Sequence, residues 1–312
     1  GEISARFRVP CVSQEKLLAD PAVDVVCICT PSGQHADQAI AAASAGKHVL
    51  VEKPMALSLG DADAMIAACD QAGVQLGVAL QRRVTPPFQR IHTAIQAGDL
   101  GDLTLGVVTM PYHRSQEYYD QAAWRGTWAL DGGVLTNQAS HHIDLLSWMM
   151  GDVESVFART ATALVDIETE DTAVVVVKFR NGALGIIEAT TATRPKDLEG
   201  SISILGSHGT VEIGGFAVNE MRHWNFLEED ERDKDVLGKY SVNPPNVYGF
   251  GHKAYYEHVV KCIDEGTSAI VDGLEGRKSL ELISAMYESV ETGKEVKLRF
   301  SPRLCKLGMI SG

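Results

Sequence analysis

Three short apolar runs, separated by alanine-rich segments of helical length, constrain the fold of residues 23–80 more than any other feature. The runs are Val23–Thr30, His48–Val51 and Gln75–Leu80, and their nearly continuous apolar character is typical of strands buried in a parallel sheet. The intervening segments, His35–Ala45 and Gly60–Ala72, are each followed by a glycine suited to a helix C-terminus. This alternation predicts right-handed βαβ units, which make up half of a doubly wound domain.

The opening unit of such a domain is not found in the sequence. A complete dinucleotide-binding fold begins with a strand, a Gly-x-Gly-x-x-Gly turn and a helix whose N-terminus holds the pyrophosphate. Before Val23 we interpret only a short strand near Val9–Val12 and a helix over Gln14–Ala19. Residues 1–87 are therefore expected to form a partial Rossmann-type domain. Either the protein is shortened at its N-terminus, or this sequence begins downstream of the glycine-rich unit.

Alternating strands replace the βαβ pattern after Pro87. We expect residues 88–300 to form a large, mostly antiparallel sheet domain and residues 301–312 a tail, so the fold class is α/β followed by α+β. A helix near Gly132–Met150 interrupts the strands, and we interpret the polar segment His223–Pro245 as an excursion or lid. The last two helices could pack on either domain. The predicted strands are Leu103–Tyr112, Val153–Leu164, Asp171–Phe179, Ala183–Thr191, Ser201–Leu205 and Thr210–Ile213, and the remaining helices are Phe88–Gln96, His252–Glu265 and Leu274–Thr292.

Charge and composition exclude several classes of function. A formal net charge of −13 argues against a nucleic-acid partner and against binding to anionic membranes. No apolar run approaches the roughly 18 residues of a spanning helix, and no signal-peptide pattern is present. The six cysteines are scattered without a Cys-x-x-Cys motif, which favours buried free thiols and a cytoplasmic location.

Lys53 follows the strand His48–Val51, at the edge of the sheet where open α/β proteins bind ligands. An ammonium group there can orient a substrate hydroxyl, stabilise a developing alkoxide or relay a proton during hydride transfer. Pro54 fixes the turn that follows. The alternative interpretation is a solvated lysine before a turn.

Asn137 and His141 are spaced by four residues, so a helix over this segment would place both side chains on one face. Imidazole titrates near neutral pH, which makes His141 a candidate general base, and the Asn137 amide can bind a sugar hydroxyl. Asp144 could orient the imidazole or pair locally. His142 lies about a quarter-turn away, so no metal site is expected here. A buried structural histidine is the alternative.

Other residues could contact an anion or an aromatic ring in the same cleft. Arg82 and Arg83 lie at another strand end, where an anionic substrate or a surface ion pair would occupy them. Trp124 and Arg125 could stack on a nicotinamide and clamp a phosphate, or could form a structural aromatic loop. Tyr118 is a weaker candidate for substrate binding.

Together these residues resemble the Gfo/Idh/MocA family of NAD(P)-dependent sugar and cyclitol oxidoreductases. Three motifs, Ile28–His35, Val51–Pro54 and Trp124–Leu146, carry a resemblance that extends from about residue 9 through nearly the whole chain. Asn137 stands where most members carry aspartate and resembles the UDP-N-acetyl-2-amino-2-deoxyglucuronate dehydrogenase branch, which oxidises the 3-hydroxyl of a nucleotide-linked sugar acid. Leu80 departs from that branch, which often has lysine at this position.

The resemblance implies NAD as cofactor, with NADP not excluded, and a homodimer or homotetramer that associates through an open sheet face. A free sugar or inositol remains an alternative substrate, and a non-catalytic binding or oligomer-forming subunit is an alternative function. Implied catalytic residues are Lys53 and His141; implied substrate-binding residues are Asn137, Arg83, His142 and Tyr118; implied cofactor-binding residues are Thr30, Pro31, Ser32, His35, Glu52, Lys53, Gln81, Trp124 and Arg125.

Overall fold

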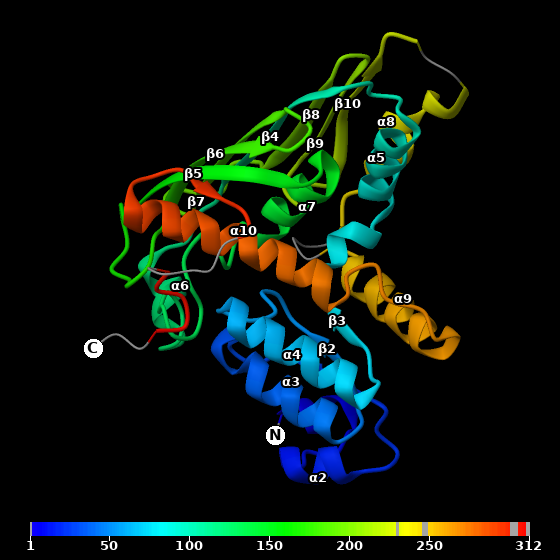
Figure 1. Cartoon of the computed structure of the whole chain (residues 1–312), viewed down its shortest axis with the longest axis vertical. Coiled ribbons are helices and arrows are strands. Elements are labelled where there is room, and N and C mark those ends of the chain that lie inside the picture. The colour runs from blue at the N-terminus through cyan, green and yellow to red at the C-terminus, as the bar shows by residue number, and fades with distance from the viewer. Residues whose placement is uncertain (1, 229–230, 245–248, 300–304, 310–312) are drawn as a thin grey trace.

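A three-stranded parallel sheet in the order β1-β2-β3 forms the N-terminal half of the molecule, which lies at the bottom of Figure 1. The structure is a computed structural model and describes residues 2–228, 231–244, 249–299 and 305–309. Helices α3 and α4 pack together beside the sheet, and their alanines Ala39, Ala42 and Ala62 are fully buried against it. The elements of this half are α1 (Glu2–Phe7), α2 (Gln14–Ala19), β1 (Val25–Ile28), η1 (Ser32–Gln34), α3 (His35–Ser44), β2 (His48–Val51), α4 (Leu59–Ala72), β3 (Leu76–Val78) and η2 (Gln81–Val84). Helix α5 (Pro86–Ala97) comes next in the chain but packs in the core of the second half through Phe88, Ile91 and Ala94.

An eight-stranded sheet in the order β10-β9-β8-β4-β7-β6-β5-β11 forms the second half. Among the strand pairs of this sheet that the structure describes, only β4–β7 is parallel, so the expectation of a parallel sheet followed by a mostly antiparallel one is confirmed. Its elements are β4 (Leu103–Pro111), α6 (Gln116–Asp120), α7 (Ser140–Met150), β5 (Val153–Ala161), β6 (Thr172–Phe179), β7 (Leu184–Thr190), β8 (Ser201–Gly206), β9 (Gly209–Gly214), β10 (Glu220–Phe226), η3 (Glu231–Asp233), α8 (Val236–Lys239), α9 (Gly251–Glu265), α10 (Gly273–Thr292) and β11 (Val296–Lys297).

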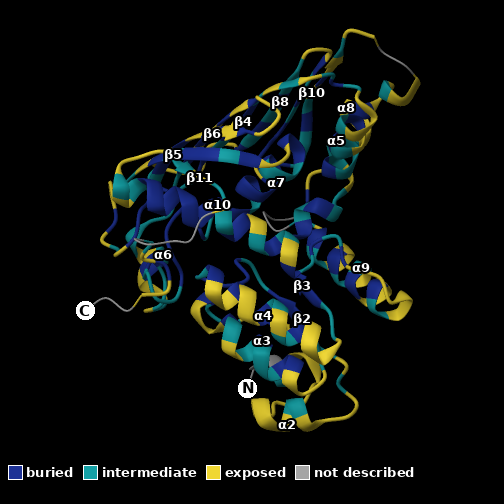
Figure 2. Cartoon of the chain, in the orientation of Figure 1, coloured by how far each residue is buried: buried dark blue, intermediate teal, exposed yellow. Residues whose placement is uncertain are grey.

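One face of the large sheet is covered and the other is open. Helix α7 lies against β4 and β8, and α10 lies against β5, so alternate residues of β6 such as Val175 and Val177 are fully buried. Their neighbours Val174 and Val176 point the other way and are about half exposed. In Figure 2 the half of α10 that passes beneath the large sheet is coloured dark blue.

Helices α9 and α10 return to the N-terminal half and join the two cores. Tyr255 of α9 packs in the core of the parallel sheet and donates a 2.9 Å hydrogen bond to the carbonyl of Val271. Leu280 of α10 belongs to that same core, whereas Ile283 on the next turn belongs to the core of the large sheet. The parallel sheet and the large sheet are therefore held by a shared helix.

Several local predictions were wrong. Residues 9–12 form an exposed irregular link rather than a strand, because no other described strand pairs with them. The helix expected over Gly132–Met150 begins only at Ser140, and residues 131–139 form turns. The segment His223–Pro245 begins within strand β10, and its last residue lies outside the described residues.

The cysteines also correct an expectation. All six are free, but Cys11, Cys27 and Cys29 are exposed rather than buried. Residues 305–309, part of the expected tail, pack back on the molecule, with Leu307 buried and the Gly308 amide donating to the carbonyl of Trp128. The rest of the tail and residue 300 lie outside the described residues. No helix in the described part of the chain is long and apolar enough to cross a membrane.

Candidate active site at the carboxyl ends of the parallel strands

Lys53 connects the parallel sheet to the second domain. Strand β2 ends at Val51, and two residues later the Lys53 Nζ donates a 2.5 Å hydrogen bond to the carbonyl of Asn137, 84 residues further along the chain. Burial lowers the pKa of Lys53, while the nearby carboxylates of Glu52 and Asp131 oppose that shift. The ammonium is thus largely desolvated at the carboxyl end of a strand, where its charge acts with little screening.

His252 of α9 contacts the carboxylate that precedes this lysine in the chain. Its Nε2 is 3.4 Å from Oε1 of Glu52, the residue that precedes Lys53. Burial raises the pKa of Glu52, but the hydrogen bond and charge of His252, together with Lys53, outweigh burial, and the pKa is lowered overall. Glu52 is therefore held as a carboxylate. The sequence placed His252 at a helix start and did not identify it as a site residue.

Asn137 contributes its backbone rather than its side chain to this contact. Its carbonyl accepts from Lys53 and, at 3.1 Å, from the hydroxyl of Ser140, whereas its side-chain amide donates to Asp131. Asp131 also accepts a 2.8 Å hydrogen bond from the Gly126 amide, and burial raises its pKa. Since Asn137 precedes α7, it does not share a helix face with His141, as the spacing had suggested.

His141 lies in the first turn of α7 and is held neutral. Burial, and then the positive charges of Lys53 and Arg82, lower its pKa well below the usual value. Its Nδ1 is buried and has no hydrogen-bond partner among the described residues. A neutral imidazole with an uncommitted nitrogen can accept a proton from a ligand, which is the property that a general base requires.

His142, the next residue, is 2% exposed and packs edge-to-face on Tyr112, with ring centroids 6.1 Å apart. Burial, together with the charge of Arg82, lowers its pKa to about 3. Neither ring nitrogen is hydrogen-bonded within the described part of the chain. Its contact with a substrate stays a prediction. Among the described residues there is also no group of three side chains placed to hold a metal ion.

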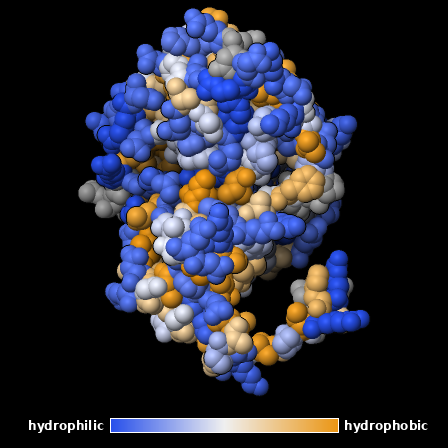
Figure 3. Space-filling view, turned by 90° about the vertical axis from the view of Figure 1, so that its right-hand side faces the viewer, coloured by the Kyte–Doolittle hydropathy of each residue, from blue (hydrophilic) through white to orange (hydrophobic). Residues whose placement is uncertain are grey.

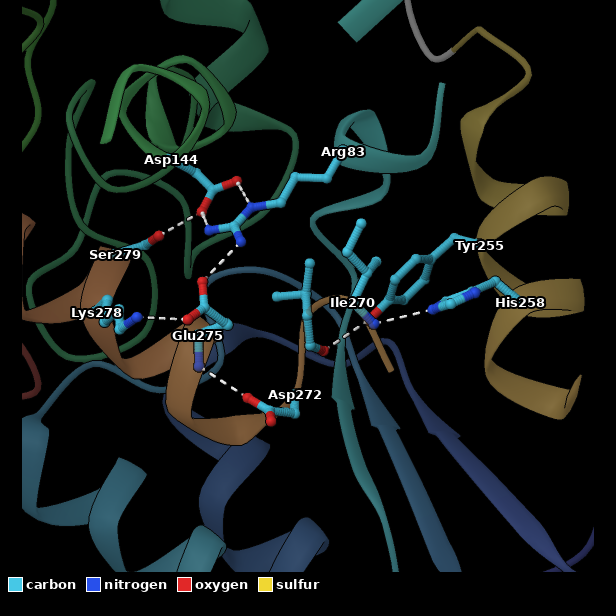
Figure 4. Close-up of polar contacts among 10 residues, drawn as sticks. Arg83, Asp144, Tyr255, His258, Ile270, Asp272, Glu275, Lys278 and Ser279 are labelled. Carbon is cyan, nitrogen blue, oxygen red and sulfur yellow. Dashed lines mark hydrogen bonds and ion pairs between the residues drawn. The ribbon is translucent and has the colours of Figure 1, made fainter. Parts of the chain in front are cut away.

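Arg83 is held in an ion-pair network, and its contact with a substrate stays a prediction. Its guanidinium is 3% exposed and forms a two-pronged ion pair with Asp144, at 2.6 and 2.9 Å (Figure 4). A third nitrogen donates to Glu275 at 2.8 Å, and Ser279 donates to Asp144 at 2.6 Å. Asp144 therefore pairs with Arg83 instead of orienting His141. This network joins η2, α7 and α10.

Trp124, Arg125 and Tyr118 form one cluster before the 131–139 turns. The guanidinium carbon of Arg125 lies 4.3 Å from the Tyr118 ring centroid and 4.8 Å from that of Trp124, and the same guanidinium donates to the Tyr118 hydroxyl. The buried Nε of Arg125 has no partner within the described residues. The positive charge of Arg125 also acts on Asp131. These contacts place the cluster beside the site, while its role toward cofactor or substrate stays a prediction.

Residues 30–35 follow β1 and face the same edge of the sheet. His35 is 1% exposed, and its ring nitrogens lie 2.9 Å from the carbonyls of Thr30 and Pro54, so the imidazole ties two strand ends together. Gly33 donates to the carbonyl of Leu130, and a Cβ there would lie 2.3 Å from the carbonyl oxygen of Ala129. Only glycine allows this close approach between the two halves.

The remaining expected cofactor residues surround these strand ends. Gln81 is 4% exposed, and its Oε1 is buried without a partner in the described part of the chain. Thr30, Pro31 and Ser32 occupy the turn after β1, where dinucleotides bind in open α/β sheets. Orphaned buried polar atoms at Gln81, Arg125 and His141 fit a polar cofactor such as NAD and a substrate lying together across these ends.

Comparison with known proteins identifies both halves. Residues 2–80 match the model "Oxidoreductase family, NAD-binding Rossmann fold", and residues 92–298 match "Oxidoreductase family, C-terminal alpha/beta domain". The chain is 30% identical over 291 residues to myo-inositol 2-dehydrogenase of Thermotoga maritima, covering 91% of this chain and 82% of that protein. It is 26% identical to scyllo-inositol 2-dehydrogenase (NAD(+)) of Bacillus subtilis, over 91% of this chain and 80% of that protein.

A solved structure is more similar still. The WlbA dehydrogenase from Bordetella pertussis, in complex with NADH and UDP-GlcNAcA, is 43% identical to the chain and superposes with a TM-score of 0.90. The match covers 96% of this chain and 86% of that protein.

Proposed function

The chain belongs to the Gfo/Idh/MocA oxidoreductase family, and from this premise we propose that it oxidises a secondary hydroxyl, the 3-hydroxyl, of a nucleotide-linked amino-sugar acid with NAD. The observation that carries the proposal is the convergence of a desolvated Lys53 and a neutral His141 at the carboxyl ends of the parallel strands. The choice of substrate is supported by the 43% identity to a dehydrogenase crystallised with UDP-GlcNAcA. The named inositol dehydrogenases are more distant, at 30% and 26% identity.

Each side chain has a distinct task in this reaction. His141 accepts the proton of the substrate hydroxyl on its free ring nitrogen. Lys53 donates to the same oxygen and stabilises the alkoxide that develops there, because its charge is poorly screened. When bound, NAD supplies the acceptor for the hydride. Glu52 and the carbonyl of Asn137 hold the ammonium in position.

The proposal is tested by following NADH formation with UDP-GlcNAcA and, in parallel, with myo-inositol. We expect efficient turnover of the nucleotide sugar and a loss of about 100-fold or more in Lys53→Ala. Binding of NADH, measured by fluorescence, and the thermal unfolding curve serve as controls for an intact fold. Unchanged turnover in Lys53→Ala would refute the assigned role.

A second candidate keeps the chemistry and changes the substrate to a free sugar or an inositol. It is favoured by the two inositol dehydrogenases, which match 91% of the chain. A preference for myo-inositol over UDP-GlcNAcA in the same assay would select it. The Lys53→Ala result would apply equally to this substrate.

A homo-oligomer in the cytoplasm is also part of the proposal. The open face of the large sheet presents apolar side chains that are 41 to 52% exposed, and such a surface favours association. Native mass spectrometry would detect a dimer or tetramer, which substitution of these side chains by lysine should dissociate. The side chains are Val174, Val176, Leu184 and Ile186.

A further inference from the structure

A pocket of about 300 Å³ lies beside the reaction site, and most of its lining has no part in the roles described so far. It is walled by four segments: η2 with the start of α5, the turn before β10, the end of α8 with the residues after it, and the start of α9. This volume lies at the lower end of the range for small-molecule sites. The pocket residues used below are Gln81, Arg82, Asn219, Lys239, Tyr240, Val242, Phe250 and Gly251.

The pocket continues from the candidate active site. Gly251 approaches Gln81 so closely that a Cβ would lie 2.9 Å from the Gln81 Cγ. The next residue, His252, reaches Glu52, which precedes Lys53. Arg82, the next residue of η2 after Gln81, acts through its charge on His141. A ligand that has its reacting carbon between Lys53 and His141 can therefore extend into this pocket.

The lining has apolar, cationic and hydrogen-bonding parts. Phe250 and Val242 are 62% and 63% exposed, so apolar surface faces water at the pocket. The face of the molecule that carries α5, α8 and α9 is turned to the viewer in Figure 3, where hydrophobic side chains gather near mid-height among hydrophilic ones. The ammonium of Lys239 lies 5.3 Å from the ring centroid of Tyr240, so a cation and an aromatic ring stand together.

Two further polar groups suit a ligand with hydrogen-bonding edges. The buried Oδ1 of Asn219 and Oε1 of Gln81 accept no hydrogen bond from any described residue. An acceptor left in this state is satisfied when a ligand donates to it. Arg82 adds a second positive charge, since guanidinium stays protonated in proteins.

We propose that this pocket binds the nucleoside diphosphate end of the substrate. The planar base would contact Tyr240 and Phe250, its N–H group would meet an orphaned amide oxygen, and the diphosphate would lie near Arg82 and Lys239. Aromatic contact and cations at one pocket match a base followed by two phosphates, whereas a free sugar has neither a flat apolar ring nor a negative charge. The inference rests on the proposed function for the identity of the substrate, but its test needs no turnover.

The test is titration calorimetry of the NADH-saturated protein with UDP alone as the probe. Phe250→Ala should raise the Kd for UDP about tenfold or more, since stacking of a base on an aromatic side chain is lost. Lys239→Gln should weaken binding several-fold and reduce its dependence on salt. Both side chains are exposed, so neither variant should unfold. Lys53→Ala should bind UDP as the wild type does.

Matched controls come from the rest of the surface. Phe7→Ala removes a phenyl ring that is 60% exposed on α1, and Lys261→Gln removes a charge from the exposed side of α9. Both should leave UDP binding unchanged. For UDP-GlcNAcA turnover, Phe250→Ala should raise KM by a factor similar to the rise in Kd and change kcat little.

UDP affinity that is the same in Phe250→Ala, Lys239→Gln and the wild type would overturn the assignment of the pocket. The assignment would also be overturned if Phe250→Ala and Lys239→Gln lost affinity for ADP but kept their affinity for UDP. That result would place the adenosine end of the cofactor in the pocket. If the protein binds UDP through Phe250 but oxidises only myo-inositol, the pocket assignment stands and the proposed substrate is wrong.

Discussion

Glu170 supplies a prediction whose size follows from the structure. This carboxyl is 4% exposed; its Oε1 accepts hydrogen bonds from the Leu135 amide at 3.0 Å and the Tyr287 hydroxyl at 2.8 Å. Its Oε2 is buried without a partner among the described residues, against Gly133. Burial, with a contribution from the neighbouring charge of Asp171, raises the pKa of Glu170 from 4.5 to about 7.

This shift couples the free energy of unfolding to pH. Below pH 4.5 the carboxyl is protonated in both the folded and the unfolded chain, so it contributes no pH dependence. Between pH 4.5 and about 7 the unfolded chain loses the proton while the folded chain keeps it, and stability falls as the pH rises. A difference of about 2.5 units corresponds to a loss of about 3 kcal/mol, complete by about pH 8.

Glu170→Gln keeps the acceptor oxygen and removes the ionisation. We therefore expect the free energy of unfolding of the variant, relative to the wild type, to increase by about 3 kcal/mol between pH 4.5 and pH 8. Urea unfolding followed by tryptophan fluorescence at four pH values measures this difference. Glu188→Gln, on the exposed side of β7, controls for the removal of a surface carboxylate. A difference for Glu170→Gln that stays flat with pH would refute the argument.

Other contacts around the candidate site lead to three further expectations. Arg83→Met should lower the free energy of unfolding by about 3–5 kcal/mol, because it leaves Asp144 buried without its partner. In urea unfolding, the double variant Arg83→Met with Asp144→Leu should recover much of the lost stability, and an equal loss in the single and double variants would contradict the argument. Gly33→Ala should raise the KM for NAD, because its Cβ would collide with the carbonyl of Ala129. Gly60→Ala, whose Cβ would meet only the Ser58 hydroxyl at an ordinary contact distance of 3.8 Å, should leave KM unchanged; equal KM values in the two variants would show that the close approach at Gly33 is not needed. The pH profile of kcat/KM should have its acid limb below pH 6.5, because burial and the charges of Lys53 and Arg82 lower the pKa of His141, and a limb above that value would exclude His141 as the base.

The parts of the fold that the sequence predicts correctly are those that local pattern determines. Buried parallel strands need continuous apolar runs, and the position of Lys53 follows once the strand is placed. The segment 9–12 is apolar but does not form a strand, because strand formation depends on a partner strand that the local pattern does not reveal. Secondary structure was therefore predictable where the apolar pattern of the segment itself determines it.

The site was less predictable where distant residues decide the local conformation. The turns of residues 131–139 are held by Glu170 and Tyr287, which lie far along the chain, so the apolar pattern before Ser140 was misread as helix. Arg82 and Arg83 are adjacent and chemically identical, yet only Arg83 meets Asp144 and Glu275. No local signal distinguishes the two arginines.

The opposing effects of Lys53 explain why the proposed base and the lysine must act as a pair. The charge of Lys53 lowers the pKa of His141 and so weakens it as a proton acceptor. The same charge would lower the pKa of a bound hydroxyl, so the driving force for proton transfer is largely preserved. In Lys53→Ala the imidazole becomes more basic, but the alkoxide loses its stabilising charge. Raising the pH supplies a neutral His141 but not that charge, so turnover of Lys53→Ala should stay low at every pH; recovery at high pH would show that Lys53 acts only by setting the protonation of the base.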